Sequence, residues 1–363
     1  MIKLLYITNG ITGAGGLERV LSLKASCLAE HCGYEVNILS LNEAGKASFY
    51  EFSEKIKFRS ISVSGNTTQY FKSYKNGVQK VVDKVQPDVI SVCDDGLKGF
   101  FLPLLLTTNA KFIYERHVSK LIEGRTNDGF IKKTTTRSKW ILMELLAKKF
   151  SKFVVLTEGN KKEWQSLRNL EVIPNPLSFY PAESSAVEEK TVICVGKISY
   201  QKGQDLLVQA WEKVWEKHPD WKLELYGYAN ENFLSTDILK QKNIHHFPPE
   251  KNIMDKYLSS SIYVMSSRFE GFGMVLIEAM ACGVPCVSFN CNYGPSDIIR
   301  NEKDGLLVKK EDIEGLSSKL LLLIENNRLR HEYGRMAKLN VKRFEQNVIA
   351  KKWDDLFQNL QNK

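Results

Sequence analysis

The stretch Ser266–Pro285, with the sequence SSRFEGFGMVLIEAMACGVP, decides the fold of this chain. It follows the apolar run 262–265, which predicts a buried parallel strand, and its glycine-containing turn leads into a predicted helix that begins at about Gly273. Two carboxylates separated by seven residues, Glu270 on the turn and Glu278 in the second helical turn, can face a ligand at the helix N-terminus. Free N–H groups and the positive dipole end favour a phosphate there, and carboxylates accept hydrogen bonds from hydroxyl groups. A ligand that has phosphate groups next to many hydroxyl groups is a sugar nucleotide, so the pattern predicts a site for one.

This segment resembles the Glu-x₇-Glu signature of retaining glycosyltransferases with the GT-B fold, those of family 4 in particular, and the motif Ala-Met-Ala-x-Gly-x-Pro over 279–285 strengthens the likeness. The resemblance covers nearly the whole chain. It implies two Rossmann-like, doubly wound parallel-sheet domains that face a central cleft. It also implies transfer of a hexose or N-acetylhexosamine, with retention at the anomeric carbon and without cofactor or metal. The implied donor is a UDP-sugar and the implied acceptor a glycan or lipid-linked glycan of a bacterial surface polysaccharide.

Length and composition predict a globular protein of two domains, since the chain has 363 residues of which 43% are hydrophobic. No apolar run reaches the roughly eighteen residues that a membrane-spanning helix needs. The opening residues 1–8 are too short for a secretory signal and predict a strand. The seven cysteines are odd in number and contain no Cys-x-x-Cys pair. They indicate reduced thiols of a cytoplasmic protein and disfavour a disulfide framework or a zinc site.

Short apolar runs alternate with helical patterns along the chain, which predicts a parallel α/β architecture. The turn-rich stretch 175–190 predicts a linker. We therefore expect an N-terminal acceptor-binding domain over 1–178 and a C-terminal nucleotide-sugar-binding domain over 190–345. The resemblance adds a final helix over 346–363 that crosses back to the first domain. The predicted strands are 2–8, 34–40, 56–63, 88–93, 111–115 and 152–157 in the first half, and 191–195, 222–227, 243–247, 261–266 and 285–289 in the second.

A glycine-rich loop over residues 9–18 follows the first predicted strand and precedes a helix. Glycines permit positive φ and close approach of a ligand, although a tight strand-to-helix connection explains them equally well. The third glycine of a dinucleotide fingerprint would fall on Glu18, which disfavours a Rossmann dehydrogenase. The loop resembles the Gly-Gly-x-Glu element of family 4. That likeness places Gly16 at the donor and Gly15 and Glu18 on the acceptor side.

Two lysines, Lys197 and Lys202, lie five residues apart on a loop between a strand and a helix of the second domain. Both could meet a diphosphate, but two lysines on a loop are also typical of a solvated basic surface. The loop resembles the Gly-Arg-x₄-Lys-Gly element of the family, with Lys197 where arginine is common. The resemblance implies a donor site made of Gly16, Lys197, Lys202, Glu270, Gly271, Phe272, Gly273, Met274, Val275 and Glu278.

His117 lies just after the predicted strand 111–115. Strand C-termini in open α/β sheets face the ligand crevice, and a neutral histidine can hydrogen-bond a sugar, although many histidines serve structure alone. Its position matches a histidine of the family, so the predicted catalytic residues are His117, Glu270 and Lys202. Arg116 and Glu115 beside it are candidates for acceptor contacts.

The segment 111–168 carries fourteen basic and six acidic residues, a net charge of +8 within a chain total of +9. Such a surface can face anionic lipid, nucleic acid or a phosphorylated substrate, or can simply be solvated. Residues 131–152 mix bulky apolar and basic side chains. They predict an amphipathic helix that either lies on an anionic membrane or packs on its own sheet. We expect a protein of the cytoplasm or of the cytoplasmic face of the inner membrane, with no nucleic-acid partner.

Two other classes of function share parts of this pattern. A sugar-nucleotide epimerase has the same two-domain architecture and would release a free epimer without an acceptor. A non-catalytic module could bind sugar or nucleic acid through the basic segment, in which case polynucleotide binding would be sensitive to salt. The paired carboxylates argue against the non-catalytic module.

Overall fold

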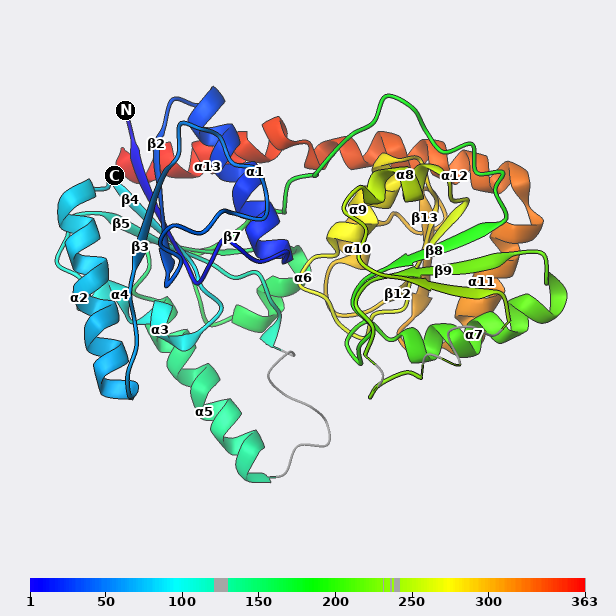
Figure 1. Cartoon of the computed structure of the whole chain (residues 1–363), viewed down its shortest axis with the longest axis horizontal. Coiled ribbons are helices and arrows are strands. Elements are labelled where there is room, and N and C mark those ends of the chain that lie inside the picture. The colour runs from blue at the N-terminus through cyan, green and yellow to red at the C-terminus, as the bar shows by residue number, and fades with distance from the viewer. Residues whose placement is uncertain (121–129, 231, 236, 238–241, 363) are drawn as a thin grey trace. The chain divides into compact units, whose positions relative to one another are not determined.

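The computed structural model describes residues 1–120, 130–230, 232–235, 237 and 242–362 (Figure 1). The chain divides into two compact units, one formed by Met1–Ser178 with Gln346–Lys363 and the other by Phe179–Glu345. Each unit contains one parallel sheet with helices packed against it. This is the doubly wound α/β architecture that the alternating sequence pattern predicts.

The first unit contains a seven-stranded sheet with the order β3-β2-β1-β4-β5-β6-β7, and all neighbours are parallel. The order reverses between β1 and β4, so the loops after these strands lie on either side of the switch point where open α/β sheets place ligands. Its strands are β1 (Lys3–Thr8), β2 (Glu35–Leu41), β3 (Lys57–Ile61), β4 (Val89–Cys93), β5 (Lys111–Glu115), β6 (Lys152–Val155) and β7 (Leu170–Val172).

Side chains alternate between the two faces of this sheet, because successive residues of a strand point in opposite directions. Leu5 and Ile7 belong to a buried core with Tyr74 and Val78 of α2, so that face of β1 is covered by α2.

The helices of the unit are α1 (Gly16–His31), α2 (Thr67–Val85), α3 (Leu97–Phe100), α4 (Leu102–Leu105), α5 (Phe130–Ala147), α6 (Glu158–Lys161), the 3₁₀ turn η2 (Lys162–Trp164) and α13 (Gln346–Gln361).

The final helix α13 belongs to the first unit and packs on α1. Trp353 is 3% exposed, and the Lys24 ammonium of α1 lies 4.2 Å from the centroid of its ring. The Tyr34 hydroxyl, in the turn after α1, donates to the Asp354 carboxylate. A buried aromatic contact and a buried polar contact therefore fix α13 to the N-terminal part of the chain.

The second unit contains a six-stranded parallel sheet with the order β10-β9-β8-β11-β12-β13. Its switch point lies between β8 and β11, the strands that precede the lysine loop and the glutamate turn. The strands are β8 (Thr191–Val195), β9 (Lys222–Tyr226), β10 (Ile244–Phe247), β11 (Ile262–Met265), β12 (Cys286–Asn290) and β13 (Gly305–Lys309). The helices are α7 (Gln204–Lys217), α8 (Ile253–Leu258), α9 (Met274–Ala281), α10 (Pro295–Ile298), α11 (Ile313–Glu325), α12 (Asn327–Asn340) and the 3₁₀ turn η4 (Val341–Phe344).

All eleven predicted strands are present, with ends that differ by at most two residues from the prediction. Two strands, β7 and β13, were not predicted. The amphipathic helix expected over 131–152 ends earlier, at Ala147, because the chain must turn before β6 starts at Lys152. Within the described ranges, no helix is both long and apolar enough to cross a membrane.

Residues 179–190, which lie in the stretch predicted to be a linker, contain no helix or strand and pack on the second unit. The Ser185 hydroxyl donates to the Ser260 carbonyl over 2.6 Å, and the Ser185 N–H donates to the Cys282 carbonyl over 2.7 Å. Val187 is 2% exposed. This segment is therefore held by specific contacts within the second unit, to which it belongs.

Candidate active site

The turn after β11 places the Glu270 carboxylate between two donors. Lys202 Nζ lies 2.7 Å from Glu270 Oε1, and the Ser267 hydroxyl donates to the same oxygen over 2.6 Å. The Glu270 N–H donates to the Asn292 carbonyl over 2.9 Å, so the backbone of the turn is fixed as well. Glu270 is only 6% exposed. The sequence predicted both Lys202 and Glu270 at the donor, and the fold brings the two side chains together.

The lysine loop, residues 196–203, is held against the end of β11 by a close backbone approach. Gly203 has φ of +65°, and a Cβ at this position would lie 2.1 Å from the Ser266 carbonyl oxygen, so only glycine fits. The Ser266 hydroxyl donates to the Lys202 carbonyl over 2.9 Å. Burial would lower the pKa of Lys202, but the neighbouring Glu270 outweighs it and raises that pKa. Lys202 therefore stays charged. The two lysines of the loop differ in burial, since Lys202 is partly buried and Lys197 is exposed.

Arg268 joins the two loops of this site, a role that the sequence did not reveal. Its guanidinium donates to both carboxylate oxygens of Asp205, over 2.8 and 2.6 Å, and to the Tyr200 carbonyl over 2.8 Å. Its backbone N–H donates to the Gln201 carbonyl over 2.8 Å. Such a bidentate pair fixes the geometry of both partners. Arg268 therefore sets the separation between the loop that carries Lys202 and the turn that carries Glu270.

Helix α9 begins directly after this turn. Its N-cap is Gly273, with φ of +104° and no side-chain hydrogen bond to the first turn, so no side chain caps the first N–H groups. Phe272 is 3% exposed and packs edge-on against Phe344, which anchors the approach to the helix. Glu278 lies in the second turn of α9 and is 2% exposed. The predicted donor residues from 270 to 278 thus form one continuous turn and helix start.

In the first unit, two carboxylates lie against the glycine-rich loop after β1, and one of them, Glu43, bonds to it. The Glu18 carboxylate lies so close to Gly13 and Gly15 that a Cβ on either glycine would come within 2.6 Å and 2.4 Å of it. Glu43 accepts hydrogen bonds from the Ile11 N–H over 2.8 Å and the Thr12 hydroxyl over 2.6 Å. Glu18 was predicted on the acceptor side, and its carboxylate lies against its own loop, whereas Glu43 was not predicted. Glu43 lies 32 residues from Ile11 and carries no local sequence signal.

The loop after β5 carries Arg116, predicted on the acceptor side, and His117, predicted to be catalytic, and it contacts the loop after β4. The His117 N–H donates to Asp95 Oδ1 over 3.2 Å, and Arg116 Nη1 donates to the Asp95 carbonyl over 2.8 Å. Asp94 accepts a hydrogen bond from Asn9 Nδ2 over 3.0 Å, which ties the end of β4 to the loop after β1. Arg116 is 3% exposed. The adjacent residues Asp94 and Asp95 thus connect the ends of β1, β4 and β5 by hydrogen bonds.

Glu115 forms the centre of a buried polar cluster below His117. Its carboxylate bonds to the Lys24 ammonium, accepts from the Ser91 hydroxyl over 2.6 Å, and lies 3.3 Å from His117 Nε2. Burial alone would raise the pKa of Glu115, but the attraction of Lys24 and the hydrogen bonds outweigh it and lower the pKa to about 2. Glu115 is 1% exposed. The expectation that Glu115 contacts the acceptor is wrong, because its carboxylate points inward and is engaged by Lys24.

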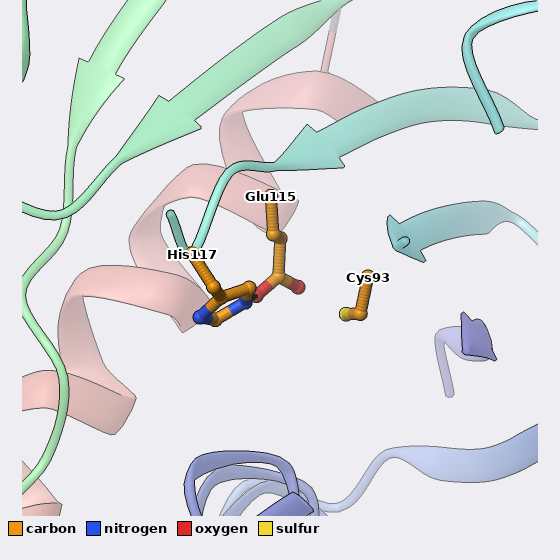
Figure 2. Close-up of side chains that lie close together, drawn as sticks. All are labelled: Cys93, Glu115 and His117. Carbon is orange, nitrogen blue, oxygen red and sulfur yellow. Dashed lines mark ion pairs between the residues drawn. The ribbon is translucent and has the colours of Figure 1, made fainter. Parts of the chain in front are cut away.

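Cys93, Glu115 and His117 form a group with ligand atoms within 4.8 Å of one another, a separation that could hold a metal ion (Figure 2). Two features oppose a metal there. The Lys24 ammonium occupies the Glu115 carboxylate, and an ammonium beside a cation is electrostatically unfavourable. Burial, followed by the charge of Glu115, raises the pKa of the Cys93 thiol well above its usual range, so the thiolate that a metal needs is disfavoured.

The structure brings the predicted residues together in two groups. In the second unit, Lys202 and Glu270 form an ion pair beside Gly271, Phe272 and Gly273, and Met274, Val275 and Glu278 continue into α9. In the first unit, Gly15, Gly16 and Glu18 follow β1, whereas Arg116 and His117 follow β5. Both groups lie at carboxyl ends of parallel strands, the edge at which open α/β sheets bind ligands.

Comparisons with known proteins agree with this geometry. Residues 180–340 match the sequence family described as Glycosyl transferases group 1. The amylovoran biosynthesis glycosyltransferase AmsD of Erwinia amylovora is 30% identical over 370 residues, which span 98% of this chain and 99% of the relative. A Campylobacter jejuni α-1,4-N-acetyl-D-galactosaminyltransferase, named for an undecaprenol-linked glycan, is 25% identical over 383 residues and the full length of both chains.

Among solved structures, a mutant of Staphylococcus aureus TarM, in complex with fondaparinux, α-GlcNAc-glycerol and UDP, superposes with a TM-score of 0.77 at 17% identity. The match covers 98% of this chain and 100% of TarM. The structural likeness identifies the GT-B fold, with two Rossmann-like units. The match to AmsD reaches 30% identity over almost the whole of both chains, and on that ground this protein belongs to the glycosyl transferases group 1 family.

Proposed function

We propose that this protein is a retaining, family 4 glycosyltransferase that moves a hexose or N-acetylhexosamine from a UDP-sugar to a glycan or lipid-linked glycan. The observation that carries the proposal is the Lys202–Glu270 ion pair, 2.7 Å long, at the uncapped N-terminus of α9. A cation and free helix N–H groups suit a diphosphate, whereas an adjacent carboxylate suits sugar hydroxyls. Both requirements of a sugar nucleotide are met where the lysine loop meets the turn after β11.

In the proposed reaction, the bond between the anomeric carbon and the diphosphate oxygen breaks while the acceptor oxygen bonds to the same face of that carbon. The acceptor hydroxyl gives its proton to the departing diphosphate oxygen, so the products are UDP and the glycoside, with no covalent enzyme intermediate. Lys202, Lys197 and the N–H groups around Gly273 stabilise the charge that grows on the leaving diphosphate. Glu278 holds ribose hydroxyls, Glu270 contacts the sugar ring, and His117 hydrogen-bonds the transferred sugar.

This charge stabilisation is proposed to need no metal ion. Two lysines and a helix N-terminus supply the positive charge that a divalent cation would otherwise provide, and the buried cluster at Cys93 is disfavoured for a metal by Lys24. Transfer should therefore persist in excess EDTA. A loss of activity in EDTA that Mg²⁺ or Mn²⁺ restores would contradict this part of the proposal.

The proposed acceptor class rests on relatives. AmsD is named for amylovoran biosynthesis and the Campylobacter jejuni relative for an undecaprenol-linked glycan, so a lipid-linked intermediate of a bacterial surface polysaccharide is the first acceptor to test. UDP as the nucleotide is supported by its presence in the TarM complex. An acceptor of this kind would place the reaction at the cytoplasmic face of the inner membrane.

Two measurements test the proposal. UDP should raise the thermal midpoint more than GDP or ADP at equal concentration, because a ligand that binds only the folded state stabilises it more the lower its Kd. Incubation with a UDP-sugar and a prenyl-diphosphate glycan should then give a product one sugar heavier, whose new linkage has the anomeric configuration of the donor by NMR. A free epimer formed without acceptor would instead support the epimerase alternative, and an inverted linkage would contradict retention.

A further inference from the structure

Helix α5 carries large apolar side chains on two opposite faces. Met143, Leu146 and Ala147 face inward and belong to the buried core of the first unit. Ile141 and Leu145 are four residues apart, share the outward face, and are 54% and 56% exposed. Leu142 beside them is 37% exposed. The inward residues alone pack α5 against the core of the first unit, so this packing does not explain the outward apolar residues.

Cations surround this outward apolar face. Arg137 lies one helical turn before Ile141, and Lys148 and Lys149 continue the turn after Ala147; all three are exposed. In the part of the chain that the structure describes, none of the three forms a salt bridge, although the charge of Lys148 contributes to the lowered pKa of Glu144. The single acid of α5, Glu144, lies to one side of the face, where it bonds to Lys120 over 2.6 Å. The outward face is therefore apolar in its centre and basic at its ends, with Glu144 at its edge engaged by Lys120.

This concentration differs from the exposed apolar residues elsewhere. Leu322 on α11 and Leu339 on α12 are 39% and 51% exposed, but each is the one exposed large apolar residue of its helix. Isolated exposures of this kind are normal in globular proteins, whereas clusters indicate a binding surface. Figure 1 shows that α5 extends away from the sheet of the first unit over its N-terminal half.

We infer that the outward face of α5, formed by Arg137, Ile141, Leu142, Leu145, Lys148 and Lys149, docks on an anionic phospholipid bilayer. An interfacial helix binds by burying apolar side chains at the level of the headgroups, while lysine and arginine contact anionic lipid phosphates. The α5 face has this composition. A second copy of the same face would bring like charges together, and a nucleic acid would leave the apolar centre exposed to water.

This inference goes beyond the proposed function and depends on it only for its biological use, which would be to hold the enzyme where a lipid-linked acceptor resides. Binding to vesicles needs no sugar donor and no acceptor. Transfer to a water-soluble acceptor analogue needs no membrane. The two properties can therefore fail separately.

The test is co-sedimentation of the full-length protein with vesicles of phosphatidylcholine alone or mixed with phosphatidylglycerol. The protein should pellet with the mixed vesicles, bind pure phosphatidylcholine at least about tenfold more weakly, and be released in part by high salt. The double variant Ile141→Ser/Leu145→Ser should bind the mixed vesicles at least about tenfold more weakly. Reversal of charge in Lys148→Glu/Lys149→Glu should have an effect at least as large.

The matched control is Leu339→Ser, which removes an equally exposed leucine from another helix and should bind vesicles as the unmodified protein does. All variants should transfer sugar to a soluble acceptor at an unchanged rate, which shows that they are folded. Failure of the unmodified protein to bind phosphatidylglycerol vesicles, or unchanged binding by Ile141→Ser/Leu145→Ser, would overturn the inference. So would a dimer in gel filtration that these two substitutions dissociate, since a second copy would then cover the face.

Discussion

Lys202 Nζ lies 2.7 Å from Glu270 Oε1, so the cation proposed to meet the diphosphate is held by the carboxylate proposed to meet the sugar. The Lys202 side chain keeps 23% exposure, whereas that of Glu270 keeps only 7%. An ammonium has three N–H groups, so the bond to Glu270 leaves others for phosphate oxygens. The pair therefore fixes the position of the charge before any donor binds, which reduces the reorganisation that the reaction requires.

Removal of the Lys202 charge should abolish most of the transfer reaction. We expect Lys202→Ala to lower kcat by about 10²–10³-fold, the loss typical of one preorganised donor to a developing negative charge. The fold should persist, because Glu270 keeps the Ser267 hydroxyl as a partner. Lys197→Ala is the matched control on the same loop and should lose less, since Lys197 is exposed. Unchanged turnover of Lys202→Ala would contradict the proposal that Lys202 contacts the diphosphate of the donor.

Glu278 should act on the nucleotide rather than on the acceptor. Glu278→Gln preserves the shape of a side chain that is 2% exposed but removes its charge, so its hydrogen bonds to ribose hydroxyls weaken. We expect the Kd of UDP, measured by calorimetry, to rise about tenfold, which corresponds to roughly 1.4 kcal/mol. The exposed Glu216→Gln is the control. A change confined to the KM of the acceptor would be incompatible with the proposed role.

The Arg268–Asp205 pair should act by positioning Lys202. We expect Arg268→Gln and Asp205→Asn to lower kcat while leaving the Kd of UDP nearly unchanged, because neither side chain is proposed to touch the donor. In a double-mutant cycle on stability the two substitutions should couple by about 1–3 kcal/mol, since they share one bidentate contact. Additive effects would show that the pair does not act as a unit.

Much of the fold follows from the sequence because the strands are buried apolar runs that lie between helical patterns. β13 was not predicted, because it directly follows the polar residues 301–304, and β7 was not predicted, because it has only three residues. The turn at Glu270 and the helix after Gly273 could be predicted, because their signals are local: a short apolar run, glycines and two carboxylates separated by seven residues.

Partners that lie far apart in the chain could not be predicted in this way. Arg268 stands inside the deciding motif, yet its partner Asp205 lies 63 residues away. Glu115 was placed beside His117, but its inward direction depends on Lys24, which lies 91 residues away. Likewise, the sequence showed that α5 is apolar and basic, and only the packing of Met143 separates its inward from its outward face.

Removal of either Lys24 or Glu115 alone should destabilise the first unit much more than removal of both. Loss of one partner leaves an uncompensated buried charge, which typically costs about 3–5 kcal/mol, whereas an apolar replacement of both is often nearly neutral. We therefore expect Lys24→Met and Glu115→Leu each to lower the urea midpoint strongly, and the double variant to recover much of that loss. A double variant as unstable as the sum of the two would show that the pair contributes more than charge compensation.

The same pair makes the stability of the folded protein depend on pH, and the pKa of Glu115 sets the direction of that dependence. Its pKa is about 2 in the folded protein, below the ordinary 4.5 that it regains on unfolding, so its stabilising effect is complete above about pH 4.5 and is lost as the pH falls towards 2. At about 1.36 kcal/mol per pKa unit, the effect is on the order of 3 kcal/mol. Urea unfolding between pH 5 and pH 2 should therefore show a flatter loss of stability in Glu115→Gln than in the unmodified protein. Parallel curves would mean that Glu115 titrates alike in both states, and then Lys24 would not hold it ionised.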